Sequence, residues 1–496
     1  MNGYGNPNIR SSFMSAVGSI LTNSGALSAL NSIAATSQTN NSLQSELASG
    51  LAINSPADNP AGYITAQGFT SQLNGLTQAT SNANQAVSLL QTAQSAIGQQ
   101  ISVVQQLNSI AVQAANGTQT PAEAQSLQTL VGQLTGQVST IANQTQFNNI
   151  NLLNGSFSGV QFQVGANEGQ TLSLSIGNTT AANIGEYATA KGTTFTNASS
   201  GVVSAAGAFT GSANSTGAVT ITGPTGGSGN FTTTATESAA AIAKAASNIS
   251  GKTGVQAQAT NTVTYNVAAS ANGNIKFKLQ ASGSGGSTIG GAIAVNASSL
   301  SEVVSQINQQ TSTSGIVASS ASGKLTLAQQ SGQNIKFSSA GTATTAGAGG
   351  TVTSLAGHLA ATGDTQQGQV QFQSSAAFTV SGSAKLAGTA SLNSLANINV
   401  GTTAGANNAI NVIKYALAGL NNQGGQLGAV QQRVSANINN LNATSQNVTT
   451  ALGVVQDANI PQVANQLTQA QIQAQSGVAA LKSSTQLQQS YLSLLP

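Results

Sequence analysis

The apolar residues between Ile410 and Val455 recur at alternating spacings of three and four residues. This heptad repeat predicts one long helix with a continuous apolar seam, as in a coiled coil. The apolar seam positions are Ile410, Ile413, Leu417, Leu420, Leu427, Val434, Ile438, Leu441, Val448, Leu452 and Val455. Gly424, Gln431 and Ser445 interrupt them. Because a long helix cannot bury its own seam, a partner of similar length is needed, in this chain or in another.

A second helical stretch ends before Asn116-Gly117, a typical helix stop, and has the length to pair with the seam. Its apolar positions include Val87, Leu90, Ile97, Ile101 and Val104. Two shorter helices are predicted on the N-terminal side. One begins near Leu27 and ends at Gly50, and the other begins at Pro121, since proline suits the first turn of a helix.

The segment 457–461 breaks the seam helix, because Pro461 cannot continue it. A last helix then carries Val463, Leu467 and Leu481. The Gly424-Gly425 pair is either a hinge or a contact between small residues, and we favour the contact.

Between the helical ends the apolar period changes to two, which predicts strands at 160–164 and 171–176. Residues 178–390 are rich in Gly, Ser, Thr and Ala, with short alternating runs and helix candidates at 239–249 and 300–307. Asn-Ile-Lys-Phe at 274–277 recurs at 334–337, so we expect two copies of a small strand-rich unit of about 60 residues.

The predicted fold is therefore α+β: a long antiparallel helical coiled-coil stem from both chain ends, with a β-rich Gly/Ser/Thr outer insertion. We expect terminal helices in 1–55 and 460–496, a helical rod with a β-hairpin in 56–177 and 391–459, and a β-rich outer region in 178–390.

Composition excludes most kinds of chemistry. Charged residues make up 4% of the chain, against about 25% in an average soluble protein. Cysteine is absent and His358 is the only histidine, so a thiolate metal site and the usual catalytic triads are not expected, nor is any cofactor. No Lys/Arg cluster predicts nucleic-acid binding, and no apolar run predicts membrane insertion. We therefore expect a protein that is not an enzyme.

Several ordered motifs at both ends resemble those of bacterial flagellins. They are Leu-Ala-Ser-Gly-Leu-Ala-Ile-Asn-Ser at 47–55, Ala-Val-Gln-Ala-Ala-Asn-Gly-Thr at 111–118, Gln-Thr-Gln-Phe-Asn at 144–148, Leu-Leu-Asn-Gly at 152–155, Phe-Gln-Val-Gly-Ala-Asn at 162–167, Leu-Gly-Ala-Val-Gln-Gln-Arg at 427–433 and Leu-Ser-Leu-Leu at 492–495. The resemblance covers roughly 20–177 and 391–496.

The resemblance implies a subunit that assembles with copies of itself into the flagellar filament, outside the cell. It implies export through the flagellar type III apparatus without a cleaved signal peptide. An export chaperone, the filament cap and the hook-junction proteins are the further partners implied. The terminal helices would be disordered in the monomer and line the filament core after assembly. Their expected core residues are Leu27, Leu30, Leu47, Val463, Leu467, Leu481, Leu492, Leu494 and Leu495.

One departure from the family pattern affects recognition by the host. The family has an Arg-Glu-Leu-Ala-Val-Gln run, whereas this chain has Asn-Ser-Ile-Ala-Val-Gln at 108–113. The arginine in that run is central to recognition by the animal innate receptor, so Asn108 should weaken that recognition.

Two other functions compete with a filament subunit. A hook-filament junction protein has similar helical ends, and a secreted adhesin or surface-layer-like protein would explain the Ser/Thr/Gly-rich middle. The scarcity of carboxylates predicts tolerance of acid, because few groups change protonation. O-linked glycan on the outer region is a compatible source of solubility.

Overall fold

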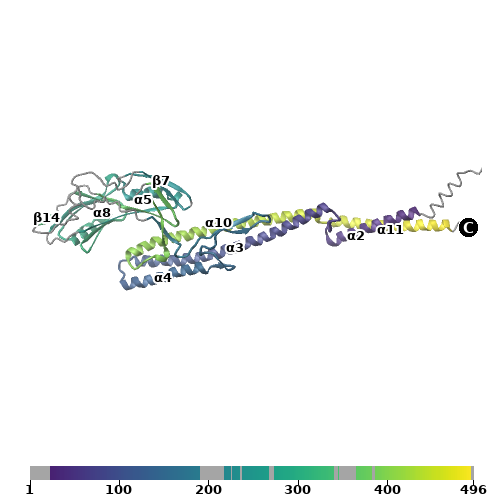
Figure 1. Ribbon diagram of the computed structural model, residues 1–496, viewed down its shortest axis with the longest axis horizontal. Coiled ribbons are helices and arrows are strands. Elements are labelled where there is room, and N and C mark those ends of the chain that lie inside the picture. The colour runs from purple at the N-terminus through teal and green to yellow at the C-terminus, as the bar shows by residue number, and fades with distance from the viewer. Residues whose placement is uncertain are drawn as a thin grey trace, which may run out of the picture. The chain divides into compact units, whose positions relative to one another are not determined.

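The computed structural model describes residues 23–189, 217–224, 226–234, 237–266, 273–339, 344–345, 365–382 and 386–492 (Figure 1). The chain forms two compact units. The first contains Met1–Ser88, Gln161–Ser173 and Gln431–Pro496, and the second contains Leu89–Val160 and Leu174–Val430. The predicted combination of long helices from both chain ends and a strand-rich middle is confirmed.

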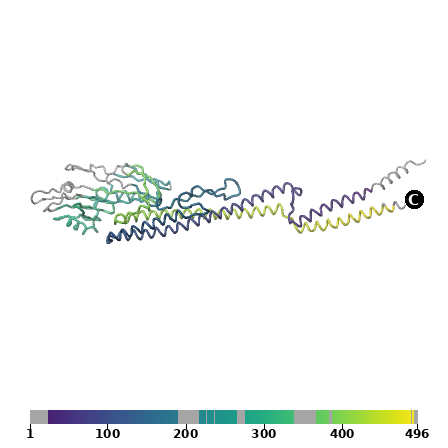
Figure 2. The backbone as a smooth tube through the Cα atoms, turned by 60° about the horizontal axis from the view of Figure 1, so that its bottom comes forward, coloured from purple at the N-terminus to yellow at the C-terminus, as the bar shows by residue number. Residues whose placement is uncertain are grey.

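Two long helices, α3 (Pro60–Ala114) and α10 (Thr403–Gln456), contribute residues to both units. In the second unit, a Cβ placed on Gly424 would lie 3.9 Å from Cγ2 of Ile97, and one on Gly428 would lie 3.9 Å from Nε2 of Gln94. Residue numbers therefore rise along α10 as they fall along α3, so the helices are antiparallel, and they run side by side in Figures 1 and 2. We call α3 and α10 the long helix pair.

In the first unit, α2 (Ser24–Ser49) packs antiparallel against α11 (Ile460–Leu492). Gly50 ends α2 in the left-handed conformation at φ 74°, and its N–H donates to the carbonyl of Glu46 at 2.8 Å. This is the predicted glycine cap. We call α2 and α11 the terminal helix pair.

The two connections of the first unit are tied to each other. Leu51 and Asp457 form an isolated antiparallel bridge. Ala52 N–H donates to the Gln456 carbonyl at 2.7 Å, and Ala458 N–H donates to the Gly50 carbonyl at 2.9 Å. The expected helix break at 457–461 is confirmed, and it is held by hydrogen bonds to the other end of the chain.

In the second unit α4 (Pro121–Gln144) begins with a capping box. Glu123 N–H donates to Thr120 Oγ1 at 3.3 Å, and Thr120 N–H donates to Glu123 Oε2 at 2.7 Å. These reciprocal bonds satisfy two backbone donors at the start of the helix. The short hairpin β1 (Gln146–Phe147) and β2 (Ile150–Asn151) follows.

The predicted hairpin is present as β3 (Val160–Gln163) and β4 (Thr171–Leu174). Its turn lies against α3 in the first unit, where a Cβ on Gly75 would be only 3.0 Å from the Cβ of Ala166. Asn82 Nδ2 also donates to the Gln163 carbonyl at 3.0 Å. Glycine at 75 is thus required by the close approach of the hairpin turn.

Three antiparallel sheets form the strand-rich part of the second unit. The largest has the order β11-β12-β8-β16-β5-β19, with bounds Ile316–Ala321, Lys324–Gln329, Gln256–Asn266, Gln369–Ser374, Gly185–Ala188 and Ser391–Ser394. The next has the order β10-β9-β13-β15, with bounds Thr288–Ala297, Gly273–Ser282, Asn334–Ser339 and Thr365–Gln366, and β14 (Thr344–Thr345) also pairs with β9. The third has the order β18-β17-β6-β7, with bounds Gly388–Thr389, Thr379–Gly382, Gly217–Thr222 and Ser228–Thr233.

A hairpin, a pair of short helices and a strand occur twice in this order. The first set is β6, β7, α5 (Ala239–Asn248), α6 (Ser250–Thr253) and β8, and the second is β9, β10, α7 (Leu300–Asn308), α8 (Thr311–Ser314) and β11. Left-handed glycines, Gly254 at φ 65° and Gly315 at φ 68°, end α6 and α8. Strand β16 pairs with β8 as β12 pairs with β11, so the second set is inserted in the chain between β8, the last strand of the first set, and its partner β16.

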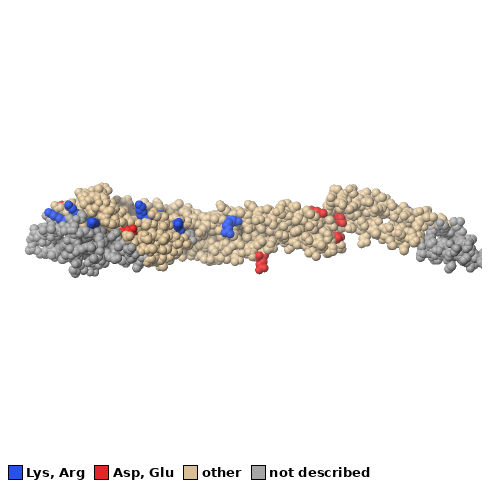
Figure 3. Space-filling view, turned by 90° about the horizontal axis from the view of Figure 1, so that it is seen from above, with Lys and Arg blue, Asp and Glu red and all other residues tan. Residues whose placement is uncertain are grey.

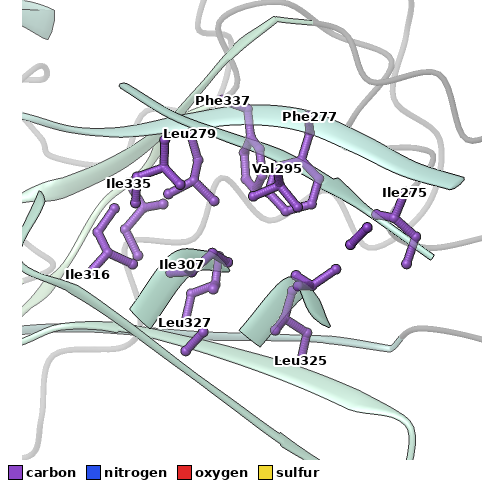
Figure 4. Close-up of a cluster of buried hydrophobic side chains, with 14 of the residues drawn as sticks. Ile275, Phe277, Leu279, Val295, Ile307, Ile316, Leu325, Leu327, Ile335 and Phe337 are labelled. Carbon is purple, nitrogen blue, oxygen red and sulfur yellow. The ribbon is translucent and has the colours of Figure 1, made fainter. Parts of the chain in front are cut away.

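The two Asn-Ile-Lys-Phe segments lie on adjacent antiparallel strands, β9 and β13. Their aromatic rings, Phe277 and Phe337, have centroids 5.8 Å apart in one core beneath α7 (Figure 4). A separate core lies beneath α5. The recurring tetrapeptide therefore fills one core, and it does not mark equivalent strands in the two sets.

The helical period resumes later than the sequence predicts. We expected helix soon after residue 391, but Ser391–Ser394 pairs with β5 as β19, and η2 (Leu395–Asn397) follows before α10 begins at Thr403. The alternating Ser-Leu-Asn-Ser sequence suits an edge strand, which explains the delay. His358, Leu494 and Leu495 lie outside the described residues.

Candidate assembly surfaces

The seam of α10 separates into two rows with different burial. One row, which we call the uninterrupted row, is apolar throughout. It is 0–9% exposed at Ile413, Leu420, Leu427, Val434, Leu441 and Val448, and partly buried at its last position, Val455. The other, the interrupted row, is only partly buried: Ile410, Leu417, Gly424, Gln431, Ile438, Ser445 and Leu452. All three seam defects belong to the second row. Because both rows are buried in a two-stranded coiled coil, α10 has one side that this chain does not fully cover.

The residues of α3 that were predicted to pack against the seam are buried or partly buried. Leu90, Ile97 and Val104 are 0–1% exposed, and Val87 and Ile101 are partly buried. Sequence reasoning missed the alanines that extend this face, Ala79, Ala83 and Ala86, which are 0–1% exposed. Their spacing of four and three residues is the signal that could have identified them. Small side chains let the helix axes approach closely.

A buried glutamine ties three segments of the second unit together. Gln100 is fully buried, and its Nε2 donates to the carbonyls of Val138 at 3.0 Å and Thr179 at 3.2 Å. If α4 or the loop after the hairpin moved away from α3, the buried Gln100 amide would lose its acceptors, at a cost in free energy. Gln100 therefore fixes the packing of these three segments. This role could not be predicted from the sequence, because a glutamine in a helix is usually exposed to solvent.

The predicted core residues of the terminal helix pair divide into two groups. Val463 is buried against Leu43 and Ala470, while Leu467 and Leu481 are partly buried. Leu27, Leu30 and Leu47 are 64%, 53% and 38% exposed. Leu492 belongs to α11. Leu43 and Ala470, which are apolar positions of the two predicted helices, form the inner contacts of this pair with Val463.

Further large apolar side chains of the first unit face solvent in a single chain. Val454 and Ile64 are the most exposed, at 83% and 73%. On α11 the exposed residues are Ile460, Ile472, Val478 and Leu487. Exposed apolar residues gathered on a few helices indicate a surface that another protein covers.

Asn108, the position altered in the receptor motif, lies on α3 in the second unit and is partly buried. Val112, one turn further on the same helix, is 55% exposed. The segment that the family resemblance links to host recognition is therefore accessible in part on the single chain.

Two of the carboxylates serve local structure. Backbone N–H groups of Ser55 and Asn54 donate to the Asp58 carboxylate at 2.8 and 3.0 Å and lower its pKa. The pKa of Glu123 is lowered by the backbone N–H of Thr120 in the same way. Figure 3 shows that most of the lysine and arginine side chains on the visible face lie over the strand-rich part.

Within the described residues, no group of three or more His, Cys, Asp or Glu side chains could hold a metal ion. Among the helices that the structure describes, none is long and apolar enough to span a membrane.

Comparison with known protein families gives matches at both ends of the chain. The bacterial flagellin N-terminal helical region matches residues 20–158, and the bacterial flagellin C-terminal helical region matches residues 410–495. These ranges contain all of α2, α3, α4 and α11, and most of α10.

Among relatives, B-type flagellin of Pseudomonas aeruginosa is 35% identical over 487 residues, which cover 93% of this chain and 96% of that protein. A flagellin of Xenorhabdus nematophila is 37% identical over 158 residues, covering 32% of this chain and 50% of the relative. Similar solved structures include FliC from Burkholderia pseudomallei (20% identity, TM-score 0.29, 70% of this chain and 99% of that chain). Another is FlgL from Xanthomonas campestris (12% identity, TM-score 0.32, 77% and 98%).

Proposed function

Because the chain belongs to the bacterial flagellin family and is a subunit of the flagellar filament, we propose that its helix faces divide into two roles. The uninterrupted row of α10 and the facing residues of α3 hold the subunit together. The interrupted row and the exposed apolar residues of the terminal helix pair are covered by neighbouring copies. The observation that carries this proposal is the exposure of Leu27, Leu30 and Leu47 on α2, whose other face packs against α11.

The size of the exposed surface supports this division. Seven large apolar side chains on α2 and α11 are 38–64% exposed. They are Leu27, Leu30, Leu47, Ile460, Ile472, Val478 and Leu487. Full burial of such a side chain contributes about 1.5–3 kcal/mol, so covering what remains exposed on all seven would contribute about 5–10 kcal/mol before the cost of association. This gain is of the same size as the cost of association, about 4–15 kcal/mol, so burial of the interrupted row of α10 must add to it in the filament.

The domain roles follow from the same division. We place residues 1–55 and 460–496 in the inner core of the filament, with ordering on assembly, and 178–390 on its outside. The exposed leucines of α2 and α11 support this, because an uncovered helix pair is marginally stable. Hydrogen exchange of the monomer tests the ordering. Exchange in α2 and α11 should be much faster than in α3 and α10, and equal protection would contradict the proposal.

The remaining partners are proposed from family membership. They are the export chaperone, the type III export apparatus, the filament cap and the hook-junction proteins. Exposed apolar residues on the terminal helices are suited to a chaperone that shields them before assembly. Secretion without cleavage is supported by the short apolar run at 13–21, which Ser and Gly interrupt. N-terminal sequencing of filament protein tests it.

Removal of α11 is the direct test of assembly. A chain that ends at Asn459 keeps α3 and α10 but lacks the partner of α2. Cells producing it should carry no filaments by electron microscopy, whereas the purified protein should keep the helical circular dichroism of the long helix pair. Normal filaments from this variant would refute the proposed role of the terminal helix pair.

A further inference from the structure

The second unit contains an open cleft of about 530 Å³ between the largest sheet and the first turns of α10. Its floor is built from β16 and β8. Gln369, Gln371 and Gln373 alternate along β16 and therefore point to one side of the sheet. Across the strand pair Gln258 lies opposite Gln371 and Thr260 lies opposite Gln369. The residues between them, Val370 and Phe372, fill the core beneath α5.

The walls are also made of carboxamides. Asn407, Asn408 and Asn411 line the cleft from α10. Asn393 from β19, with Asn397 and Asn399 from the segment that leads to α10, line it from the other side. No lysine or arginine is among the lining residues, and Glu186 is the one charged group there.

Hydrogen bonds among the lining groups hold them in place. Gln373 is 5% exposed, and its Nε2 donates to Oε1 of Gln258 and of Gln371, both at 3.3 Å. Tyr415 Oη donates to Gln373 Oε1 at 3.4 Å. Glu186 is also 5% exposed and accepts from Asn393 Nδ2 at 3.2 Å. The polar floor is therefore preorganised, which reduces the ordering cost of binding a ligand.

The chemistry of the lining selects one class of ligand. A carboxamide offers an acceptor oxygen and two donor hydrogens, and a hydroxyl group is likewise both donor and acceptor. A surface of neighbouring carboxamides thus matches a molecule with several adjacent hydroxyls. The buried carboxylate of Glu186 accepts a hydrogen bond from a hydroxyl group but repels an anion. Cavities of about 300–1,000 Å³ hold small organic ligands.

We propose that this cleft is a binding site for a neutral saccharide of one or two sugar residues. All the lining residues lie within one unit of a single chain, so the site needs no residue from a second copy. The saccharide comes either from the surroundings or from a glycan carried by the protein itself. Both sources supply the same hydroxyl chemistry.

The test uses full-length monomer from a host that does not glycosylate it. Saturation-transfer NMR is recorded with glucose, galactose, N-acetylglucosamine and their disaccharides, and with glucuronate as the anionic counterpart of glucose. At least one neutral sugar should bind, and glucuronate should bind about tenfold more weakly or not at all. Glu186→Gln should reduce this discrimination.

Matched variants on α10 locate the site. Asn408→Leu removes a carboxamide from the cleft wall and should weaken binding about tenfold. Asn421→Leu makes the same change at an exposed position of α10 outside the cleft and should leave binding unchanged. Absence of binding by every neutral sugar, equal binding of glucuronate and glucose, or equal loss in both variants would overturn the proposal.

Protein sheared from native filaments and dissociated distinguishes the two sources. If this native protein binds added sugar as the unglycosylated monomer does, the ligand of the cleft is a free saccharide. Loss of binding in native protein alone, together with an intact mass above that of the chain, assigns it to the protein's own glycan. Either result supports the site.

Discussion

Replacement of Val454 by serine separates the stability of the subunit from the stability of the filament. Val454 is 83% exposed on α10, so its side chain contributes little to the packing of a single chain. Valine and serine also have similar helix propensities. We therefore expect the free energy of unfolding of the monomer to change by less than about 0.5 kcal/mol, as for a typical surface substitution.

The same change should weaken the filament. Full burial of an apolar side chain contributes about 1.5–3 kcal/mol, so covering the remaining 83% of Val454 contributes about 1.2–2.5 kcal/mol. Since 1.4 kcal/mol corresponds to a factor of ten, the critical concentration for assembly should rise about 8- to 60-fold. Ile289→Ser is the control for assembly, because this residue lies on β10 in the strand-rich part and is only 38% exposed, so the change should lower monomer stability but leave the critical concentration unchanged.

Two measurements decide the matter. Sedimentation of polymerised protein gives the critical concentration from the subunit left in the supernatant, and urea denaturation followed by circular dichroism gives the monomer stability. An unchanged critical concentration would show that neighbouring copies do not cover Val454. A fall in monomer stability of the size expected for the filament would show that the residue is packed within the chain.

Three further outcomes are expected. Leu420→Ala should lower the free energy of unfolding of the monomer by about 2–5 kcal/mol in urea denaturation, because Leu420 is fully buried and its truncation leaves a cavity. The thermal midpoint should stay nearly constant as pH falls from neutrality and drop only below about pH 4, because the carboxylates that stabilise the fold, Asp58, Glu123 and Glu302, have lowered pKa values through backbone N–H donors. A group with a depressed folded-state pKa stabilises above its unfolded pKa and loses this effect as pH falls through the folded value, so a midpoint that already drops in mild acid contradicts the assignment. In a spectrophotometric titration one of the six tyrosines, Tyr415, should ionise with a pKa of about 12, since burial and a nearby carboxylate disfavour the phenolate, and Tyr415→Phe should remove that step.

The long helices could be predicted because their period extends over many turns. The seam predicts α10, and its three defects already mark the row that is less buried, since Gly424, Gln431 and Ser445 are spaced by multiples of seven. The helix caps at Gly50 and Thr120 follow from local rules that depend on a few neighbouring residues.

Features that depend on distant contacts could not be predicted. The glutamines of β16 fit an ordinary alternating strand, and nothing local places Asn408 above them. The insertion of one strand-and-helix set between β8 and β16 is also invisible in a sequence that shows only that short segments recur. The exposure of Leu27 and Leu30 has the same origin, because a weakly amphipathic helix does not reveal which face meets its own chain.

The terminal helix pair can form only after synthesis of the chain is nearly complete, because its two helices lie at opposite ends of the sequence. Asn23 Nδ2 donates to the Ser484 carbonyl at 3.4 Å, and Ser484 Oγ donates to Asn23 Oδ1 at 2.9 Å, across 461 residues of sequence. At the usual rate of synthesis, about 5–20 residues per second, α2 waits about 20–90 s on the ribosome before its partner exists. Throughout that interval Leu43 has no partner helix to cover it. Helices α2 and α11 therefore cannot pair until the last segment of the chain has been made. The residues of α2, which are made first, stay without their partner helix for the longest time.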